Sequence, residues 1–342
     1  MNIGQKKAVD IVIEGHNLLL LGSAGTGKSF VINEIAKSLK KIGKNVQITC
    51  STGIACSVYK GVNACTIHQF TGISDGRYGP DRITDVIKNN PKHKHVLKNI
   101  YNVDTIIVDE CSMISQQVFD SVNNVCKIKD PSRDFGGIQI IFCGDFLQLP
   151  PVASPSYGDE GKYCFESDNF KKTFPHRVIL TEIVRQSEEQ FITAINEVCN
   201  GVISLESENF ISKLNRHLDV QAGSRTVKLF AKNDLADDYN RKCLLEFPGN
   251  VYEFKSTDQG LAKKMSTISA PHVLWLKVGC PVILLRNLSD KLVNGLQGYV
   301  KDIPDDGSGP TVHFPTANMT KRIPKVKFTV YSPRLNTDIA VR

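Results

Sequence analysis

Short apolar runs separated by helical patterns organise the first half of the chain. The runs occupy residues 17–22, 46–51, 104–110 and 138–145, and a helical pattern covers residues 28–41. Apolar residues fill these runs without alternation, which is typical of parallel strands covered on both faces. Strands that alternate with helices predict a layered α/β fold.

The second half of the chain begins with the same alternation of strand-like and helical patterns, and the pattern then changes. Residues 177–186 are strand-like, residues 188–202 are helical, and residues 226–247 show a strand followed by a helix, which predicts a second α/β layer. From Val251 onward, short β-rich runs are separated by Gly, Pro and Asn. This pattern favours a small antiparallel barrel or sheet. The weakly patterned segment 74–100 is expected to be an exposed insertion.

The amino-acid composition limits the broad class of protein but does not decide its function. The 342 residues are 41% apolar and 23% charged, with a net charge of +7 that permits a polyanionic partner. None of the ten cysteines forms a C-x-x-C pair, which predicts core thiols in a reducing compartment, without disulfides or zinc. The chain shows no secretory signal and no apolar stretch that approaches ~18 residues, so no membrane span is expected.

A glycine-rich loop follows the first apolar run. The segment GSAGTGKS at 22–29 matches G-x-x-x-x-G-K-[ST] between a strand and a helix. Its backbone N–H groups suit a β-phosphate, Lys28 suits the β- and γ-phosphates, and the Ser29 hydroxyl suits Mg²⁺. The alternative is a glycine-rich turn that only caps a helix. The predicted ATP-binding residues of this loop are Gly22, Gly25, Thr26, Gly27, Lys28 and Ser29.

Two adjacent carboxylates end the run TIIVDE. Asp109 is positioned to hold Mg²⁺, and Glu110 is positioned to activate an attacking water. An Asp-Glu pair is often solvated surface charge, but here it ends an apolar strand in a chain with a phosphate loop. An adjacent pair of this kind is common in motor ATPases of the RecA type.

The segment IIFCGDFLQLPPV at 140–152 places one amide, Gln148, after a buried strand. Ligands of such sheets bind beyond the carboxyl ends of the strands, so Gln148 is expected beside the γ-phosphate. There it would report to an adjoining domain whether the γ-phosphate is present. The alternative is a turn glutamine bonded to its own backbone.

The chain resembles the Pif-type helicases, a RecD-like branch of helicase superfamily one. The resemblance rests on the phosphate loop and on motifs in the order expected of that family: TCSTGIAC, CTIHQFTGI, IIVDECSM, FGGIQIIFCGDFLQLPPV, LTEIVRQ and LKVGCPVILLRNL. It implies an α/β architecture with two RecA-like parallel-sheet domains of the P-loop NTPase class. A small β-rich, SH3-like insertion domain completes the expected architecture.

The resemblance also implies domain bounds. Residues 1–172 would form the first RecA-like domain, with the basic segment 74–100 inserted in it. Residues 173–250 would begin the second RecA-like domain, and residues 251–342 would form the insertion domain. Further family motifs are expected beyond Arg342, so the chain is expected to be C-terminally truncated.

Residue roles carry over by motif. The resemblance implies that Gln5 reads the adenine edge, that Gln148 touches the γ-phosphate and links it to the DNA site, and that Arg185 reaches the γ-phosphate from the second domain. Taken alone, Arg185 would be an ordinary surface arginine and His68 a packed side chain. The residues expected to face single-stranded DNA are Thr52, Gly53, Thr66 and His68.

The activity implied is that of an ATP-dependent DNA helicase. It would use ATP and Mg²⁺, move 5′ to 3′ on single strands, and unwind duplexes and G-quadruplexes in DNA repair, recombination and telomere maintenance. The expected partners are single-stranded, forked or structured DNA. A monomer in the nucleus or the mitochondrion is expected.

Two other function classes stay open. The chain could be an ATP- and DNA-binding regulator or decoy that does not unwind, or a phosphate-loop kinase for a small molecule. The lysine-rich segment 88–99 is either a solvated helix face or a contact to DNA phosphates. The single tryptophan, Trp275, is predicted to lie in the core rather than to stack on bases.

Overall fold

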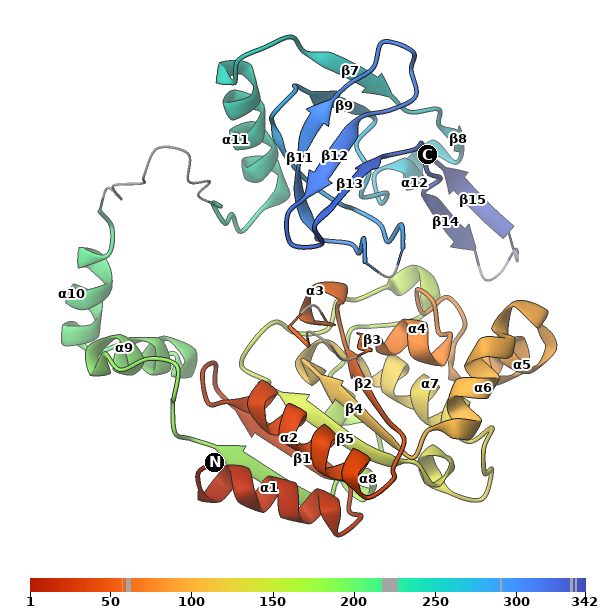
Figure 1. Ribbon diagram of the computed structural model, residues 1–342, viewed down its shortest axis with the longest axis vertical. Coiled ribbons are helices and arrows are strands. Elements are labelled where there is room, and N and C mark those ends of the chain that lie inside the picture. The colour runs from red at the N-terminus through yellow and green to blue at the C-terminus, as the bar shows by residue number, and fades with distance from the viewer. Residues whose placement is uncertain (57, 60–62, 217–226, 290, 333–334, 336) are drawn as a thin grey trace. The chain divides into compact units, whose positions relative to one another are not determined.

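The computed structural model describes two compact units, unit 1 at Met1–Asn215 and unit 2 at Arg216–Arg342 (Figure 1). The described residues are 1–56, 58–59, 63–216, 227–289, 291–332, 335 and 337–342.

Unit 1 is built on a six-stranded sheet with the order β3-β2-β4-β5-β1-β6. Every pairing in it is parallel, which confirms the α/β class predicted from the apolar runs. Because the strands are parallel, all their carboxyl ends meet at one edge of the sheet. The strands are β1 (Leu18–Gly22), β2 (Val46–Cys50), β3 (Cys65–Thr66), β4 (Thr105–Asp109), β5 (Gln139–Gly144) and β6 (His176–Leu180).

Helices cover both faces of this sheet (Figure 1). Alternate residues of β1 point to opposite sides: Leu18 and Leu20 join one buried cluster, and Leu19 joins the other. The first cluster lies under α1 (Ile3–Ile13) and α2 (Lys28–Lys41). The second lies under α4 (Ile67–Thr71), α5 (Pro80–Asn89), α6 (Lys94–Asn102) and α7 (Gln116–Cys126).

Aromatic packing fixes α7 on the second face. Phe119 of α7 meets Phe142 of β5 edge-on, with ring centroids 5.6 Å apart, and both rings are fully buried. Each such buried side chain stabilises the fold by roughly 1.5–3 kcal/mol. The helix begins where the Ser115 hydroxyl accepts a hydrogen bond from the Val118 amide at 3.1 Å, which fixes the N-terminus of α7.

Short helices complete unit 1. They are α3 (Gly53–Cys56), α8 (Phe170–Thr173) and the single-turn 3₁₀ segments η1 (Pro91–His93), η2 (Cys111–Met113), η3 (Asp134–Gly137), η4 (Pro155–Tyr157) and η5 (Cys164–Glu166).

Residues 173–250, predicted to begin a second RecA-like domain, contain one strand and three helices in the part of the segment that the structure describes. Their strand, β6, pairs with β1 and extends the first sheet. Val178 and Leu180 of β6 are buried in the cluster under α1, which explains why the strand joins that sheet. Helices follow β6 in the described part of the segment, and the chain divides into its two compact units after Asn215. The helices are α9 (Glu189–Asn200), α10 (Leu205–Lys213) and α11 (Asn233–Glu246).

Unit 2 is rich in β-structure, as predicted from Val251 onward. Three small sheets are antiparallel: β10-β11-β12-β13, β14-β15-β8 and β7-β9. The elements are β7 (Tyr252–Lys255), β8 (Gln259–Gly260), α12 (Ala262–Met265), β9 (Val273–Leu276), β10 (Pro281–Ile283), β11 (Gln297–Asp302), β12 (Thr311–Phe314), β13 (Met319–Arg322), β14 (Thr329–Ser332) and β15 (Thr337–Val341).

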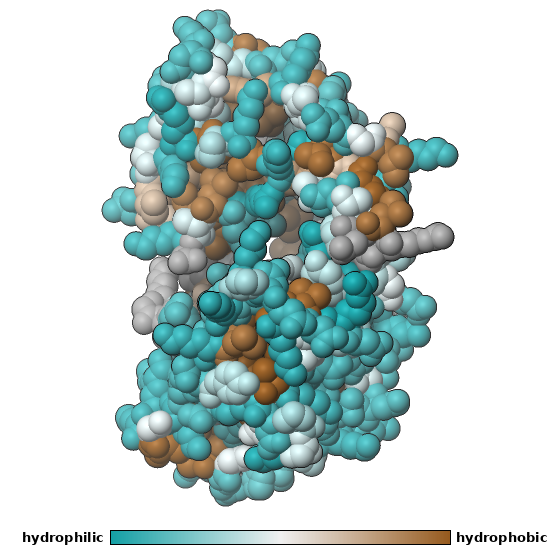
Figure 2. Space-filling view, turned by 90° about the vertical axis from the view of Figure 1, so that its right-hand side faces the viewer, coloured by the Kyte–Doolittle hydropathy of each residue, from teal (hydrophilic) through white to brown (hydrophobic). Residues whose placement is uncertain are grey.

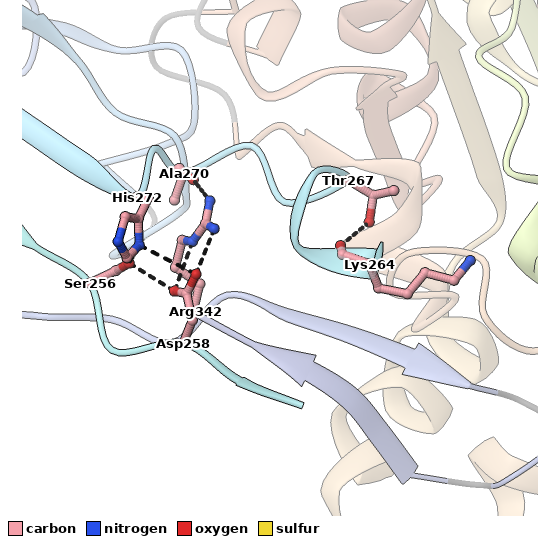
Figure 3. A network of polar contacts seen from close by, with 7 residues as sticks. All are labelled: Ser256, Asp258, Lys264, Thr267, Ala270, His272 and Arg342. Atoms are coloured by element: carbon pink, nitrogen blue, oxygen red, sulfur yellow. Dashed lines mark hydrogen bonds and ion pairs between the residues drawn. The ribbon is translucent and has the colours of Figure 1, made fainter. Parts of the chain in front are cut away.

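A polar network joins β15 to the segment that precedes β8 (Figure 3). The Arg342 guanidinium donates to both carboxylate oxygens of Asp258, at 3.0 and 2.7 Å, and to the carbonyl oxygen of Ala270 at 2.8 Å. Asp258 also accepts from the Ser256 hydroxyl at 2.8 Å, and the His272 ring lies 3.4 Å away. Hydrogen bonds from Arg342 hold the pKa of Asp258 well below its usual range.

Trp275 does not lie in the core, so that prediction is wrong. Its side chain is 39% exposed on β9, opposite Glu253 of β7. The indole N–H donates to the Glu253 carboxylate at 3.0 Å, and the Arg241 guanidinium lies 5.5 Å from the ring centre. Leu276, the next residue along β9, is the one that is buried.

The face shown in Figure 2 is largely hydrophilic, with scattered apolar patches. Within the described ranges, no helix has both the length and the apolar content needed to cross a bilayer.

Lys277 provides a test of how unit 2 is held together. It is 5% exposed, and its ammonium donates to the carbonyl oxygens of Leu245 and Phe247, where α11 ends. Lys277→Met keeps the apolar stem but leaves both carbonyls without this donor, so we expect a loss of about 1–3 kcal/mol. Fluorescence of Trp275, the single tryptophan, would follow the unfolding of unit 2.

The matched control is Lys263→Met on α12, where the lysine is exposed. It should leave the denaturant midpoint of the Trp275 signal unchanged. Equal midpoints for Lys277→Met and the parent would contradict this assignment.

Candidate functional site

The sheet brings the motif segments to one edge. Each segment follows the carboxyl end of a strand, and β1 with its loop lies between β5 and β6. The strands that carry Thr52 and Thr66 lie on the far side of β4 and β5 from β1. The segments are 22–29 after β1, 52–53 after β2, 66–68 after β3, 109–110 after β4, 145–148 after β5 and 182–185 after β6.

The loop after β1 needs its glycines. Gly25 and Gly27 have φ values of 86° and 84°, which L side chains rarely adopt. A Cβ at Gly22 would lie 2.7 Å from the Thr26 hydroxyl oxygen and 2.8 Å from the Leu180 carbonyl oxygen. Gly27 is the N-cap of α2 and makes no side-chain cap, so the first N–H groups of the helix are left for an anion.

Lys28 lies within the loop. Its ammonium donates to the carbonyl oxygens of Gly22 and Ser23, at 2.7 and 3.1 Å. Ser29 is half-buried in the first turn of α2, directly after it. The ammonium is therefore held within the loop by two neutral carbonyl oxygens. Phosphate oxygens, which are negatively charged, are stronger acceptors and can replace them.

Asp109 is a buried carboxylate whose two oxygens are both oriented by donors. It is 5% exposed; Oδ1 accepts from the Glu110 amide at 2.9 Å, and Oδ2 accepts from the Tyr59 hydroxyl. Burial, together with the negative charge of Asp109, raises the pKa of Tyr59 far above its ordinary value, so the phenol stays a donor. Tyr59 lies between two motifs and belongs to no sequence pattern, so its role could not be predicted from the sequence.

Glu110 has an unusual backbone and an unusual acidity. Its φ of 56° is in the left-handed region, and the residue is half-buried. Burial, followed by the charge of Asp109, raises the pKa of Glu110, while Lys28 acts in the opposite direction. Asp145 adds to the negative potential. A carboxylate with a raised pKa is a better proton acceptor than an ordinary glutamate, which suits a general base.

Gln148 contacts Asp145. The Gln148 side-chain amide donates to Asp145 Oδ2 at 3.1 Å, and its backbone N–H donates to the Asp145 carbonyl oxygen at 3.0 Å. The Leu147 amide donates to Asp145 Oδ1 at 3.1 Å. Gln148 is exposed, so its amide is free to leave this turn for a ligand. Asp145 was missed as a site residue, although its place directly after a buried strand could have drawn attention to it.

Gln5 and Arg185 both lie against the phosphate loop. The Gln5 amide donates to the Thr26 carbonyl oxygen at 3.3 Å, while its oxygen accepts from the Asn2 backbone N–H at 3.1 Å. The Arg185 backbone N–H donates to the Gly25 carbonyl oxygen at 3.2 Å, and its side chain is exposed. The extension of β6, a strand of the first sheet, therefore brings Arg185 to the loop.

The predicted DNA-facing residues begin two short helices at neighbouring strand ends. The Thr52 hydroxyl accepts from the Ala55 amide at 3.3 Å, and Gly53 is the first residue of α3. The Thr66 hydroxyl accepts from the Gln69 amide at 3.2 Å and caps α4. Burial lowers the pKa of His68, so its ring is neutral near neutral pH.

The fold and the site define a class. A parallel sheet with a phosphate loop after β1 and an acidic pair after β4 is a P-loop NTPase unit of the RecA-like type. The sequence profile described as "PIF1-like helicase" matches residues 1–209, and the profile "DNA helicase Pif1, 2B domain" matches residues 265–303. The chain belongs to the PIF1-like helicase family, as the motif resemblance predicted.

Curated relatives are longer than this chain. The ATP-dependent DNA helicase PIF1 of Saccharomyces cerevisiae is 34% identical over 312 residues, which are 88% of this chain and 35% of that protein. The human protein of the same name is 33% identical over 318 residues, or 91% of this chain and 48% of that protein. The chain thus spans less than half the length of these relatives.

Solved structures share the fold. The Pif1 helicase of Candida albicans is 28% identical with a TM-score of 0.81, covering 100% of this chain and 82% of that chain. A Bacteroides Pif1 bound to single-stranded DNA is 25% identical with a TM-score of 0.80, covering 99% of this chain and 79% of that chain.

The raised pKa of Glu110 leads to a prediction about the stability of the fold. A folded-state pKa above the unfolded value means that ionised Glu110 destabilises the fold once the pH exceeds the unfolded value of about 4.3. We expect Glu110→Gln to raise the thermal midpoint at neutral pH in metal-free buffer, with the difference vanishing below about pH 4. Far-UV circular dichroism measures this midpoint.

The control is Glu14→Gln, which alters a carboxylate that is 67% exposed at the end of α1. It should give the same midpoint as the parent across the pH range. A Glu110→Gln midpoint at or below that of the parent at neutral pH would refute the electrostatic account.

Proposed function

We propose that this chain is the motor region of an ATP-dependent DNA helicase that moves 5′ to 3′ along single-stranded DNA. One observation carries the proposal: a phosphate loop, an acidic pair and Gln148 share one sheet edge with Thr52 and Thr66 at neighbouring strand ends. The relatives that it resembles are named ATP-dependent DNA helicases, and a kinase for a small molecule has no use for the second set of residues.

In this proposal ATP binds at the loop after β1. The N–H groups of the loop and of the first turn of α2 surround the β-phosphate, and Lys28 exchanges its contacts with Gly22 and Ser23 for phosphate oxygens. Gln5, which already contacts the loop at Thr26, would read the adenine edge. The Bacteroides Pif1 complex with ADP-AlF3 and single-stranded DNA shares this fold.

Magnesium fits the same place. Mg²⁺ prefers oxygen ligands and is usually held by one or two protein oxygens together with phosphates and water. Asp109, whose carboxylate is fixed by two donors, and the Ser29 hydroxyl are such oxygens. When bound, the ion neutralises charge on the phosphates.

Three side chains would serve hydrolysis. Glu110, with its raised pKa, accepts a proton from the attacking water. Gln148 leaves Asp145 to contact the γ-phosphate and so signals which nucleotide is present. Arg185, tethered to Gly25 through its backbone, has an exposed guanidinium available for the phosphate charge.

Single-stranded DNA would lie along the ends of β2 and β3. Thr52, Gly53, Thr66 and His68 present hydroxyl, backbone and neutral imidazole groups there, which suit the phosphate and sugar contacts of a strand held without sequence preference. The lysines of the segment 88–99 are exposed on α5 and α6 and η1, which favours a supporting contact to phosphates.

We also propose that the protein unwinds forked, duplex and G-quadruplex DNA, and that it works in DNA repair, recombination and telomere maintenance. It would act as a monomer in the nucleus or the mitochondrion. One related structure is described as two coordinating Pif1 helicases at forked double-stranded DNA, so light scattering on a forked substrate is the proper test of the monomer.

The deciding experiment measures ATP turnover with and without a single-stranded oligonucleotide, and strand separation on a duplex with a 5′ single-stranded tail. A helicase motor is stimulated by the oligonucleotide and separates the strands. Binding of both ligands with little turnover would instead indicate a regulator or decoy, and turnover indifferent to DNA would indicate a kinase-like enzyme.

Lys28→Ala tests the phosphate loop. Loss of a preorganised cation at the transferred phosphoryl group should lower DNA-stimulated turnover by a factor on the order of 10²–10³. The control is Lys41→Ala, an exposed lysine in the last turn of the same helix, which should behave like the parent. Turnover of Lys28→Ala near the parental rate would show that the loop is not the ATP site.

Gln148→Ala tests the sensor. The variant should bind ATP and single-stranded DNA separately but lose most of the effect of one on the other, which is typically a factor of about 5–150. Fluorescence anisotropy would give the DNA affinity without nucleotide, with ADP and with an ATP analogue. Gln190→Ala, at an exposed position of α9, is the control. An unchanged nucleotide effect in Gln148→Ala would exclude the sensor role.

A further inference from the structure

The segment that follows the DNA-facing residues Thr52 and Gly53 returns to the nucleotide site. Seven residues after Thr52, the Tyr59 hydroxyl donates to Oδ2 of Asp109, the carboxylate proposed to hold Mg²⁺. Tyr59 is 3% exposed and Asp109 is 5% exposed. The contact is therefore shielded from water. A hydrogen bond to a carboxylate is strong in such surroundings, because water does not compete for it.

This hydrogen bond fixes the orientation of the carboxylate. Oδ1 of Asp109 accepts from the amide of the next residue, Glu110, at 2.9 Å, and Oδ2 accepts from the Tyr59 hydroxyl, so the two bonds together orient the carboxylate. Groups that orient a metal ligand in this way typically contribute a factor of about 10–100 to metal affinity or activity. Tyr59 occupies that position for Asp109.

A continuous set of hydrogen bonds runs from Thr52 to Tyr59. The Thr52 hydroxyl accepts from the Ala55 amide at 3.3 Å, and the Thr52 carbonyl oxygen accepts from the Cys56 amide at 3.4 Å and the Cys56 thiol at 3.3 Å. The Val58 amide donates to the Ala55 carbonyl oxygen at 3.3 Å, and the Tyr59 amide to that of Cys56 at 3.1 Å. These bonds connect Thr52 to the backbone of Tyr59.

We propose that Tyr59 is a positioning residue that ties the single-stranded DNA site at Thr52 and Gly53 to the metal carboxylate Asp109. Through this contact, a strand seated on Thr52 favours the orientation of Asp109 that holds Mg²⁺-nucleotide. By linkage, bound Mg²⁺-nucleotide favours the strand to the same degree. The inference rests on the proposed function, because it assigns a route between the two ligands of that function.

Tyr59→Phe tests the proposal, since it removes one hydroxyl and keeps the buried ring. Fluorescent ADP is titrated with MgCl₂ to find the half-saturating Mg²⁺ concentration, which should rise about 10-fold or more. The affinity for a fluorescent oligothymidine is then measured with and without Mg²⁺-ADP, and the ratio of the two should fall close to one. A residue that merely packs would leave the Mg²⁺ requirement and this ratio unchanged.

The control is Tyr101→Phe, which removes a hydroxyl from a tyrosine that is 55% exposed on α6. It should match the parent in both measurements. If Tyr59→Phe also matches the parent in either one, the proposal is overturned. A parent chain that binds neither Mg²⁺-ADP nor the oligonucleotide would refute the proposed function itself, and the inference with it.

A measurement on the parent chain keeps the proposal testable if Tyr59→Phe does not fold. Hydrogen exchange is followed in the peptide that spans Gly53 to Tyr59, with saturating Mg²⁺-ADP and with saturating ADP in EDTA. Exchange should be several-fold slower with the metal present, because an ordered Asp109 holds Tyr59 in place. Equal exchange in the two conditions would overturn the proposal.

Discussion

Parallel pairing of six strands is the constraint on which unit 1 depends. It forces the loops after all strands to the same edge, so residues as distant in sequence as Lys28, Asp109 and Gln148 share one surface. The order of the strands then determines which functional groups lie next to one another. The loops after β1, β4 and β5 hold the groups suited to a nucleotide, while those after β2 and β3 present hydroxyl and backbone groups. An antiparallel sheet would divide these loops between two edges.

Negatively charged side chains lie near the Lys28 ammonium at the same edge of the sheet. Asp109, Glu110 and Asp145 act together on the site, and the pKa of Glu110 is raised although Lys28 opposes the shift. Such a cluster is costly without a ligand, because burial disfavours each additional charge. In the proposed function a bound cation would relieve this repulsion, and the raised pKa of Glu110 suits a proton acceptor.

Sequence alone was sufficient where a pattern is local. Unalternated apolar runs located β1, β2, β4 and β5, and glycine spacing located the phosphate loop. Sequence was insufficient where the outcome depends on which partner a segment meets. The run at 177–186 predicts a strand, but only burial of Val178 and Leu180 against α1 decides that it extends the first sheet. Tyr59 lacks any pattern, since its partner is Asp109, fifty residues away.

The placement of β6 changes how Arg185 is connected to the site. A strand at the sheet edge continues into a segment whose Val184 and Arg185 amides both donate to the Gly25 carbonyl oxygen, at 2.9 and 3.2 Å. A Cβ at Gly25 would lie 3.1 Å from that of Arg185, so the two segments are in close contact. The backbone of the phosphate loop is therefore shaped in part by residues some 160 positions further along the chain. A rearrangement of the loop around a nucleotide would therefore act directly on the segment that leads from β6 into α9.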